Sequence, residues 1–377
     1  MTKRNESRGT LSVSKRVRAS DRRIWAASQT GHCIAQWQRS PCPFVKSASC
    51  LFTGLITLSI LHTAFPVEGA ALAKTRVSIA GGRWQINDEI TYPGAKAEGL
   101  LLNVRMVNAT FEDQRRPQFD AEQNTDEFIA RIPEYVAHGV RAFTLNLQGG
   151  TPGYEGAVNS AFEPDGSLRN SYLRRVRRAI EACDRHGAVV ILGCYYQRQD
   201  QVLKDEQAVR AGVVHVARWL QSAPFRNVLL EIANEFGHGG FDHRLLKEPA
   251  GQVELIQLAK RTAPDLLVST SGLGDGSQHD QVALASDFLL IHFNSTPLAD
   301  IPKQIKALKP YSKPIVCNED QKSGEPGAQA AKLCVEQGAS WGLMLEKLNQ
   351  HFPFTFRGTS DDPAVYAALK ELAARKP

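Results

Sequence analysis

From residue 100 onward, short runs of apolar residues alternate with longer segments in which apolar residues recur at helical spacing. The short runs have the length expected of buried β-strands, and the longer segments have the periodicity of amphipathic helices. Repeated strand-helix units of this kind are typical of a closed (β/α)8 barrel, the TIM-barrel fold, which takes about 250 residues. The predicted strands are residues 100–108, 142–147, 188–195, 228–235, 266–270, 288–294, 314–319 and 341–346.

The connections between these strands carry the predicted helices. Several of them end at a residue that stops a helix, such as Gly187 or Pro310. The alternative architecture is an open doubly wound sheet, but residues 107–110, which follow the first strand, lack the glycine-rich phosphate loop of that fold. The predicted helices are residues 125–138, 171–186, 206–221, 252–262, a short one within 277–285, 298–308, 328–337 and 362–375.

A β-hairpin pattern precedes the first barrel strand, at residues 76–93. We expect this hairpin to close the bottom of the barrel, the end at which the strands begin. Residues 74–377 then form one barrel domain, and residues 1–73 form a leader.

The leader has the pattern of a signal peptide. Lys46 precedes the apolar run 51–65, and the small residues Ala71 and Ala73 offer a cleavage site. This run is short for a membrane-spanning helix, which needs about 20 residues, although a membrane anchor through 51–65 is the alternative. We therefore expect a secreted or periplasmic protein with a signal peptide at about 45–73. A true start of translation near Val45 would explain the polar, arginine-rich stretch 1–44.

The net charge of +6 also comes from the leader, because residues 1–44 hold nine Lys/Arg and two acids. Residues 74–377 carry a net charge of only −1 and show no basic patch of the kind that nucleic-acid phosphates require. The cysteines that follow the leader fit neither a zinc pattern nor a dense disulfide scaffold, so we expect buried free thiols. They are Cys183, Cys194, Cys317 and Cys334.

The fourth predicted strand ends in Glu235 and the seventh in Glu319. Active sites of (β/α)8 barrels lie at the C-terminal ends of the strands, where strands four and seven stand nearly opposite each other. Two such carboxylates can cleave a glycosidic bond, one by attacking the anomeric carbon and the other by protonating the leaving oxygen. Capping a helix or pairing with an arginine is the alternative role for either glutamate.

These strand ends resemble glycoside hydrolase family 5, a cellulase-like family of the clan A retaining barrel hydrolases, over residues 100–357. The sharpest match is Val-Leu-Leu-Glu-Ile-Ala-Asn-Glu at 228–235, and Pro-Ile-Val-Cys-Asn-Glu at 314–319 is similar to the seventh-strand motif. The resemblance implies that Glu235 is the acid/base, that Asn234 binds the sugar 2-hydroxyl and that Glu319 is the nucleophile.

The resemblance also suggests the residues around this pair. Arg105 matches the first-strand arginine that supports the nucleophile, His292 matches the sixth-strand histidine, and Trp341 matches the tryptophan that floors the sugar at the cleavage point. Taken from the residues alone, Arg105 could instead pair with Glu231, and both His292 and Trp341 could be ordinary core residues.

This chain departs from the family pattern at several positions. Tyr195 replaces the usual third-strand histidine, and Asn294 replaces the sixth-strand tyrosine. The proline and glycine that follow the two glutamates become Phe236 and Gln321. Because Asn294 has no phenolic hydroxyl to offer Glu319, we expect a tyrosine of the third strand, Tyr195 or Tyr196, to supply that hydrogen bond.

The sequence thus predicts a retaining glycoside hydrolase that acts on a β-linked oligo- or polysaccharide by double displacement through a covalent glycosyl-enzyme. We expect no cofactor, no metal and no nucleic-acid partner. Two other classes stay open. One is a catalytically inactive carbohydrate-binding barrel, suggested by the replaced positions. The other is a metal-dependent barrel hydrolase, for which His238 and His243 lack a clear third ligand.

Overall fold

The computed structural model describes residues 74–116, 118–149 and 156–375. The predicted signal peptide and the apolar run 51–65 lie outside the described residues, so both stay predictions. Among the helices of the described ranges, none is long and apolar enough to cross a membrane.

A ring of parallel strands forms the centre of the molecule. Six of them pair in the order β11-β4-β5-β6-β7-β8, and β9 pairs with β10. Parallel bridges from Ser271 to Leu290 and from Val316 to Ser340 join the two groups and close the ring. Each strand falls within a predicted run, so the predicted TIM barrel is confirmed. The strands are β4 (Asn103–Arg105), β5 (Ala142–Asn146), β6 (Val189–Tyr195), β7 (Val228–Ala233), β8 (Val268–Ser269), β9 (Leu289–His292), β10 (Ile315–Glu319) and β11 (Gly342–Leu343).

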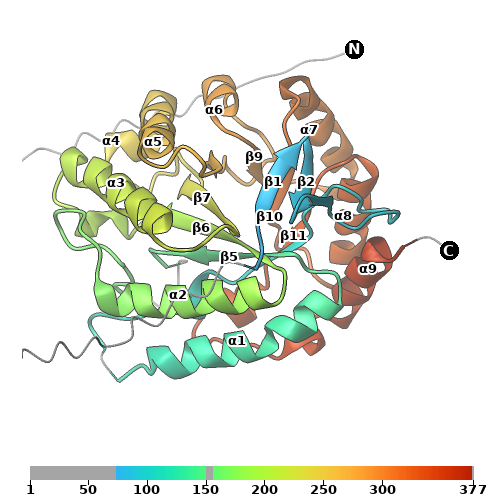
Figure 1. Ribbon diagram of the computed structural model, residues 1–377, viewed down its shortest axis with the longest axis horizontal. Helices are drawn as coiled ribbons and strands as arrows, with labels where there is room; N and C mark the ends of the chain where they lie inside the picture. The colour runs from blue at the N-terminus through green and yellow to red at the C-terminus, as the bar shows by residue number, and fades with distance from the viewer. Residues whose placement is uncertain (1–73, 117, 150–155, 376–377) are drawn as a thin grey trace, which may run out of the picture. The chain divides into compact units, whose positions relative to one another are not determined.

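Helices follow the strands and surround them (Figure 1). Three of the helices begin at an aspartate, Asp120, Asp205 or Asp362, whose side chain accepts a hydrogen bond from a backbone N–H of the first turn. The helix after the fifth strand, α6, is short, as predicted. The helices are α1 (Ala121–Ala137), α2 (Asn170–Arg185), α3 (Glu206–Ser222), α4 (Arg244–Lys247), α5 (Pro249–Thr262), α6 (Asp280–Ala285), α7 (Ile301–Leu308), α8 (Gly324–Glu336) and α9 (Pro363–Ala373).

An antiparallel sheet of β1 (Val77–Ala80), β2 (Arg83–Ile86) and β3 (Glu89–Ile90) precedes the barrel. Trp84 of β2 is fully buried, and its ring packs edge-on against Phe288 with centroids 5.4 Å apart. The same apolar cluster contains residues from the beginnings of the barrel strands, such as Leu101 and Leu229. The predicted hairpin therefore closes the bottom of the barrel, and a short third strand extends it.

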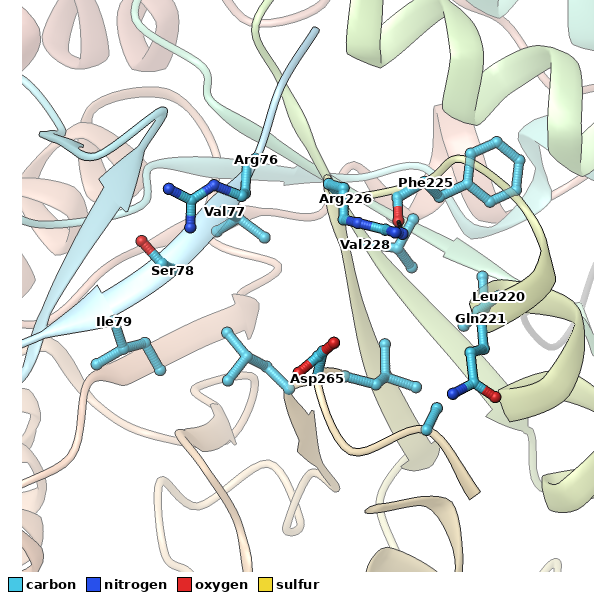
Figure 2. Close-up of a pocket in the computed structure, with 13 residues that line it drawn as sticks. Arg76, Val77, Ser78, Ile79, Leu220, Gln221, Phe225, Arg226, Val228 and Asp265 are labelled. Carbon is cyan, nitrogen blue, oxygen red and sulfur yellow. Dashed lines mark hydrogen bonds between the residues drawn. The ribbon is translucent and has the colours of Figure 1, made fainter. Parts of the chain in front are cut away.

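A cavity of about 470 Å³ lies at this bottom end, between β1, the end of α3 and the start of β7 (Figure 2). Its walls are mainly apolar side chains of these elements and of the segment 263–267 before β8, with Arg76, Arg226 and Asp265 among the lining residues. None of the residues predicted to act on a substrate lines this cavity. It is therefore separate from the strand-end site.

The barrel interior becomes polar toward the C-terminal ends of its strands. Buried polar side chains there come from several strands, whereas the cluster around Trp84 is apolar. They include Thr144, Asn146, Glu231 and Asn318. The cysteines of the barrel are all buried free thiols, as predicted.

Candidate active site

Glu235 and Glu319 come together at the mouth of the barrel, where β7 and β10 end. One carboxylate oxygen of each and a ring nitrogen of His292 all lie within 4.8 Å of one another. The Glu235 side chain is 14% exposed and that of Glu319 is 6% exposed. The two predicted carboxylates therefore share one largely buried site that keeps some access to solvent.

The backbone at Glu235 has an unusual conformation. Its φ of +51° lies in the left-handed region, which side chains other than glycine rarely adopt. The Glu235 N–H donates a hydrogen bond of 2.8 Å to Ser271 Oγ, on the segment that follows β8. This hydrogen bond holds the turn by which the chain leaves β7 and keeps Glu235 beside His292.

Arg105, from the end of β4, forms an ion pair with Glu319. Its Nε lies 2.8 Å from Glu319 Oε2, and its Nη2 donates to Asn234 Oδ1 at 2.6 Å. Burial lowers the pKa of Arg105, but the neighbouring Glu319, Tyr196 and Glu231 raise it by more, so the guanidinium stays charged. The ion pair expected between Arg105 and Glu319 is thus present. Glu231 raises the pKa of Arg105 but is not its ion-pair partner.

His292 lies between the two carboxylates. Its Nδ1 is 3.2 Å from Glu235 Oε1 and 3.6 Å from Glu319 Oε2, and its side chain is fully buried. Burial lowers the pKa of His292, but the charge of Glu319 and the hydrogen bond to Glu235 together raise it above 6.5. Burial raises the pKa of Glu235, but the bond and charge of His292 outweigh burial and lower it. A proton shared by the two groups therefore rests on the imidazole.

Asn294, just after β9, donates from Nδ2 to Glu319 Oε1. The predicted tyrosine donor is therefore not needed, and the role predicted for Tyr195 is wrong. Tyr195 is fully buried, and its hydroxyl donates 2.6 Å to the Val209 carbonyl on α3. The glycine at position 212 of α3 makes this placement possible, because a Cβ there would lie 2.2 Å from the Tyr195 oxygen. The ring of Tyr196, in contrast, lies 6.0 Å from the Arg105 guanidinium.

The predicted sugar platform at Trp341 is also wrong. Trp341 is fully buried, and its Nε1 donates 2.9 Å to Asp320 Oδ2. The pairing of Gly342 with Asn103 sets Trp341 well below the level of Arg105 in the barrel wall. The alternative of core packing therefore applies, and Asp320 is turned away from the site by its bond to this indole.

Gln197 is a site residue that the sequence pattern did not single out. Its Nε2 donates to Glu235 Oε2 at 3.4 Å, and its Oε1 accepts from Asn234 Nδ2 at 3.1 Å. It follows the end of β6 by two residues. Glu235 was selected because it is among the first polar residues at the end of an apolar strand. The same rule would have found Gln197.

Glu235, His292 and Glu319 have the donor types of a metal site. The Arg105 guanidinium, 2.8 Å from Glu319 Oε2, would repel a cation at that carboxylate. The histidines of the following loop have other partners: His238 Nδ1 accepts from the Gly240 N–H, and His243 Nδ1 lies 2.8 Å from the buried Asp200. The arrangement thus favours acid-base chemistry over metal binding.

Comparison with known proteins gives structural matches only. No family model and no curated protein matches this chain. A glycoside hydrolase family 5 enzyme from Prevotella bryantii matches with a TM-score of 0.54 and 11% identity, over 76% of this chain and 99% of that one. An endo-1,4-beta-mannanase from Rhizomucor miehei gives 0.55 and 11%, over 79% and 98%. A broad-specificity endoglucanase from Clostridium longisporum gives 0.54 and 9%, over 76% and 98%. At these identities the similarity shows the fold, so this chain has the (β/α)8-barrel fold of these enzymes.

Proposed function

We propose that this protein is a retaining glycoside hydrolase with Glu319 as nucleophile and Glu235 as acid/base. The observation that carries the proposal is that carboxylate oxygens of the two residues lie within 4.8 Å. Retaining enzymes have carboxyl groups about 5–5.5 Å apart, whereas inverting enzymes need about 6.5–9.5 Å to hold a water. The separation supports direct attack by a carboxylate.

The contacts of Glu319 suit a nucleophile. Arg105 donates to one carboxylate oxygen and Asn294 to the other, so the orientation of the group is fixed from two sides. Such preorganisation reduces the reorientation needed when the carboxylate attacks the anomeric carbon. The attack forms a Glu319–sugar ester and breaks the bond to the leaving oxygen.

Glu235 would protonate that leaving oxygen. His292 Nδ1 is 3.2 Å from Glu235 Oε1, so a protonated imidazole can pass a proton to this carboxylate. Glu235 then gives the proton to the departing hydroxyl and is left ionised. In the second step Glu235 removes a proton from water, the resulting hydroxide attacks the anomeric carbon, and Glu319 is released.

A β-linked polysaccharide is the proposed substrate class. The structural matches include an enzyme named endo-1,4-beta-mannanase and one named broad-specificity endoglucanase, and these names suggest this class. Export by the predicted signal peptide would bring the enzyme to polysaccharides, which do not enter cells. Because Trp341 is buried, we propose that other groups hold the substrate, and that Gln197 and Asn234, which contact each other beside Glu235, bind its hydroxyls.

A panel of β-glycans and aryl β-glycosides tests this function. We expect turnover by the parent, loss of turnover in Glu319→Ala, and partial recovery with azide, which replaces the missing nucleophile. We expect Glu235→Gln to lose activity most strongly on substrates with poor leaving groups. Glu336→Gln, at an exposed position of α8, is the control and should keep turnover. Normal turnover in Glu319→Ala, or binding without hydrolysis across the panel, would overturn the proposal.

A further inference from the structure

We propose that Gln321 is a positioning residue for the nucleophile. Its backbone N–H holds the side-chain amide of Asn294 so that the nitrogen, and not the oxygen, faces Glu319. The inference rests on the proposed function for its kinetic consequence, but the geometry behind it stands on the contacts alone.

Three hydrogen bonds define the arrangement. The backbone N–H of Gln321 donates to Asn294 Oδ1 at 3.1 Å, and Gln321 Nε2 donates to the Asn294 carbonyl oxygen at 3.3 Å. Asn294 Nδ2 in turn donates to Glu319 Oε1. The side-chain amide therefore accepts on one side and donates on the other.

An amide carries an acceptor oxygen and a donor NH2 group of nearly the same shape, so its neighbours decide which end faces which group. Rotating the Asn294 amide by half a turn would place its NH2 group against the Gln321 N–H and its oxygen against the Glu319 carboxylate. Both contacts would be repulsive. The Gln321 N–H thus selects the orientation that offers a donor to Glu319.

The surrounding segments hold Asn294 and Gln321 in place. The Phe293 N–H donates to the Glu319 carbonyl at 2.9 Å, and Lys322 Nζ donates to the Phe293 carbonyl at 2.7 Å. On the other side, a Cβ at Gly274 would lie 3.2 Å from the Asn294 Cβ, so the backbone there approaches closely. These contacts tie the end of β9 to the end of β10, with the amide between them.

A backbone N–H has a specific chemical test, because proline removes it and alanine keeps it. In Gln321→Ala, which loses only the bond to the Asn294 carbonyl, we expect kcat/KM within about twofold of the parent. In Gln321→Pro we expect kcat/KM to fall by about 10- to 100-fold, the range of a lost charge-assisted hydrogen bond.

A double-mutant cycle separates positioning from general damage. If Gln321 acts through Asn294, adding Gln321→Pro to Asn294→Ala should cause no further loss of kcat/KM. An equal loss in both backgrounds, or equal behaviour of Gln321→Pro and Gln321→Ala in a folded protein, would overturn the proposal. Thermal unfolding of each variant establishes that it is folded.

Side-chain amide NMR tests the geometry without activity. With ¹⁵N labelling, the Asn294 NH2 signals, identified by their absence in Asn294→Asp, should exchange slowly and shift strongly in Glu319→Gln. In Gln321→Pro they should lose both properties, and in Gln321→Ala they should keep them. An inactive parent with these signals would refute the glycosidase proposal and leave Gln321 as the positioning residue. Unchanged Asn294 signals in Gln321→Pro would refute the role of Gln321, whatever the activity.

Discussion

Arg105 Nε lies 2.8 Å from Glu319 Oε2, and the two side chains are 0% and 6% exposed. A buried ion pair contributes little when whole, but removing one partner leaves an unpaired charge in a low-dielectric site. The arginine also reaches Asn234, so it links the strand that carries the proposed nucleophile to the strand that carries the proposed acid.

We expect Arg105→Met to lower the free energy of unfolding by about 3–5 kcal/mol at neutral pH, because Glu319 would lose its buried partner. Urea titration measures the loss. The control is Arg76→Met, whose ion pair with Asp88 is 51% and 68% exposed and should contribute less than about 1 kcal/mol. Similar losses in the two variants would show that burial does not set the strength of the Arg105 pair.

His292→Phe should change the pH dependence of both stability and activity. The pKa of His292 is raised on folding, so its stabilising contribution is fully present below its unfolded value of 6.5 and is lost as pH rises through the folded value. The difference in unfolding free energy between parent and variant should therefore shrink toward alkaline pH.

In the same variant the basic limb of the kcat/KM pH profile should move to lower pH. Without the imidazole, only the Glu235 carboxyl can hold the proton that the leaving group needs. His243→Phe is the control. Asp200 raises the pKa of His243 in the same direction, yet His243 contacts neither glutamate, so only stability should respond. A basic limb that stays in place in His292→Phe would remove the imidazole from the proton path.

Trp341→Phe should weaken folding and leave substrate affinity unchanged. The variant loses the hydrogen bond from Nε1 to Asp320, a buried acceptor, at about 1–3 kcal/mol. KM for a cleaved glycan should stay within about twofold, since the ring has no exposed face to stack on a sugar. A large rise in KM with unchanged stability would restore the platform role.

Trp84→Ala tests the closure of the barrel bottom. Removing a fully buried tryptophan from an apolar cluster should lower the unfolding free energy by about 3–5 kcal/mol, as seen by calorimetry or urea titration. Trp219→Ala, at a partly exposed position of α3, should have a smaller effect. At low temperature both variants should keep the parent kcat, because neither residue contacts the strand-end site.

The barrel and most of the site were predictable because both follow from strand order. Buried parallel strands are continuous apolar runs, and their C-terminal ends gather at one mouth of the barrel. The order of the strands therefore assigns Glu235 and Glu319 to one place, and the family resemblance assigned Arg105 and His292 to the same place. Asn294 was also predicted at this mouth, but we expected a tyrosine hydroxyl, and not the Asn294 amide, to donate to Glu319.

The errors at Tyr195 and Trp341 have a common physical source. A single sequence does not give the register between neighbouring strands, nor the point at which side-chain alternation stops near a strand end. Gly212 offered one usable signal, because a glycine inside a helix often leaves room for a side chain packed against it. A helix glycine predicts the position of such a side chain only when the residue that faces it is known.

The left-handed backbone at Glu235, with its φ of +51°, has a consequence for directed evolution. Glycine adopts this conformation without the penalty that a side chain brings. A library selected for heat resistance alone should therefore enrich Glu235→Gly, and its best survivors would be inactive. If the proposed function holds, stabilising this protein in the laboratory requires that every round also select for turnover.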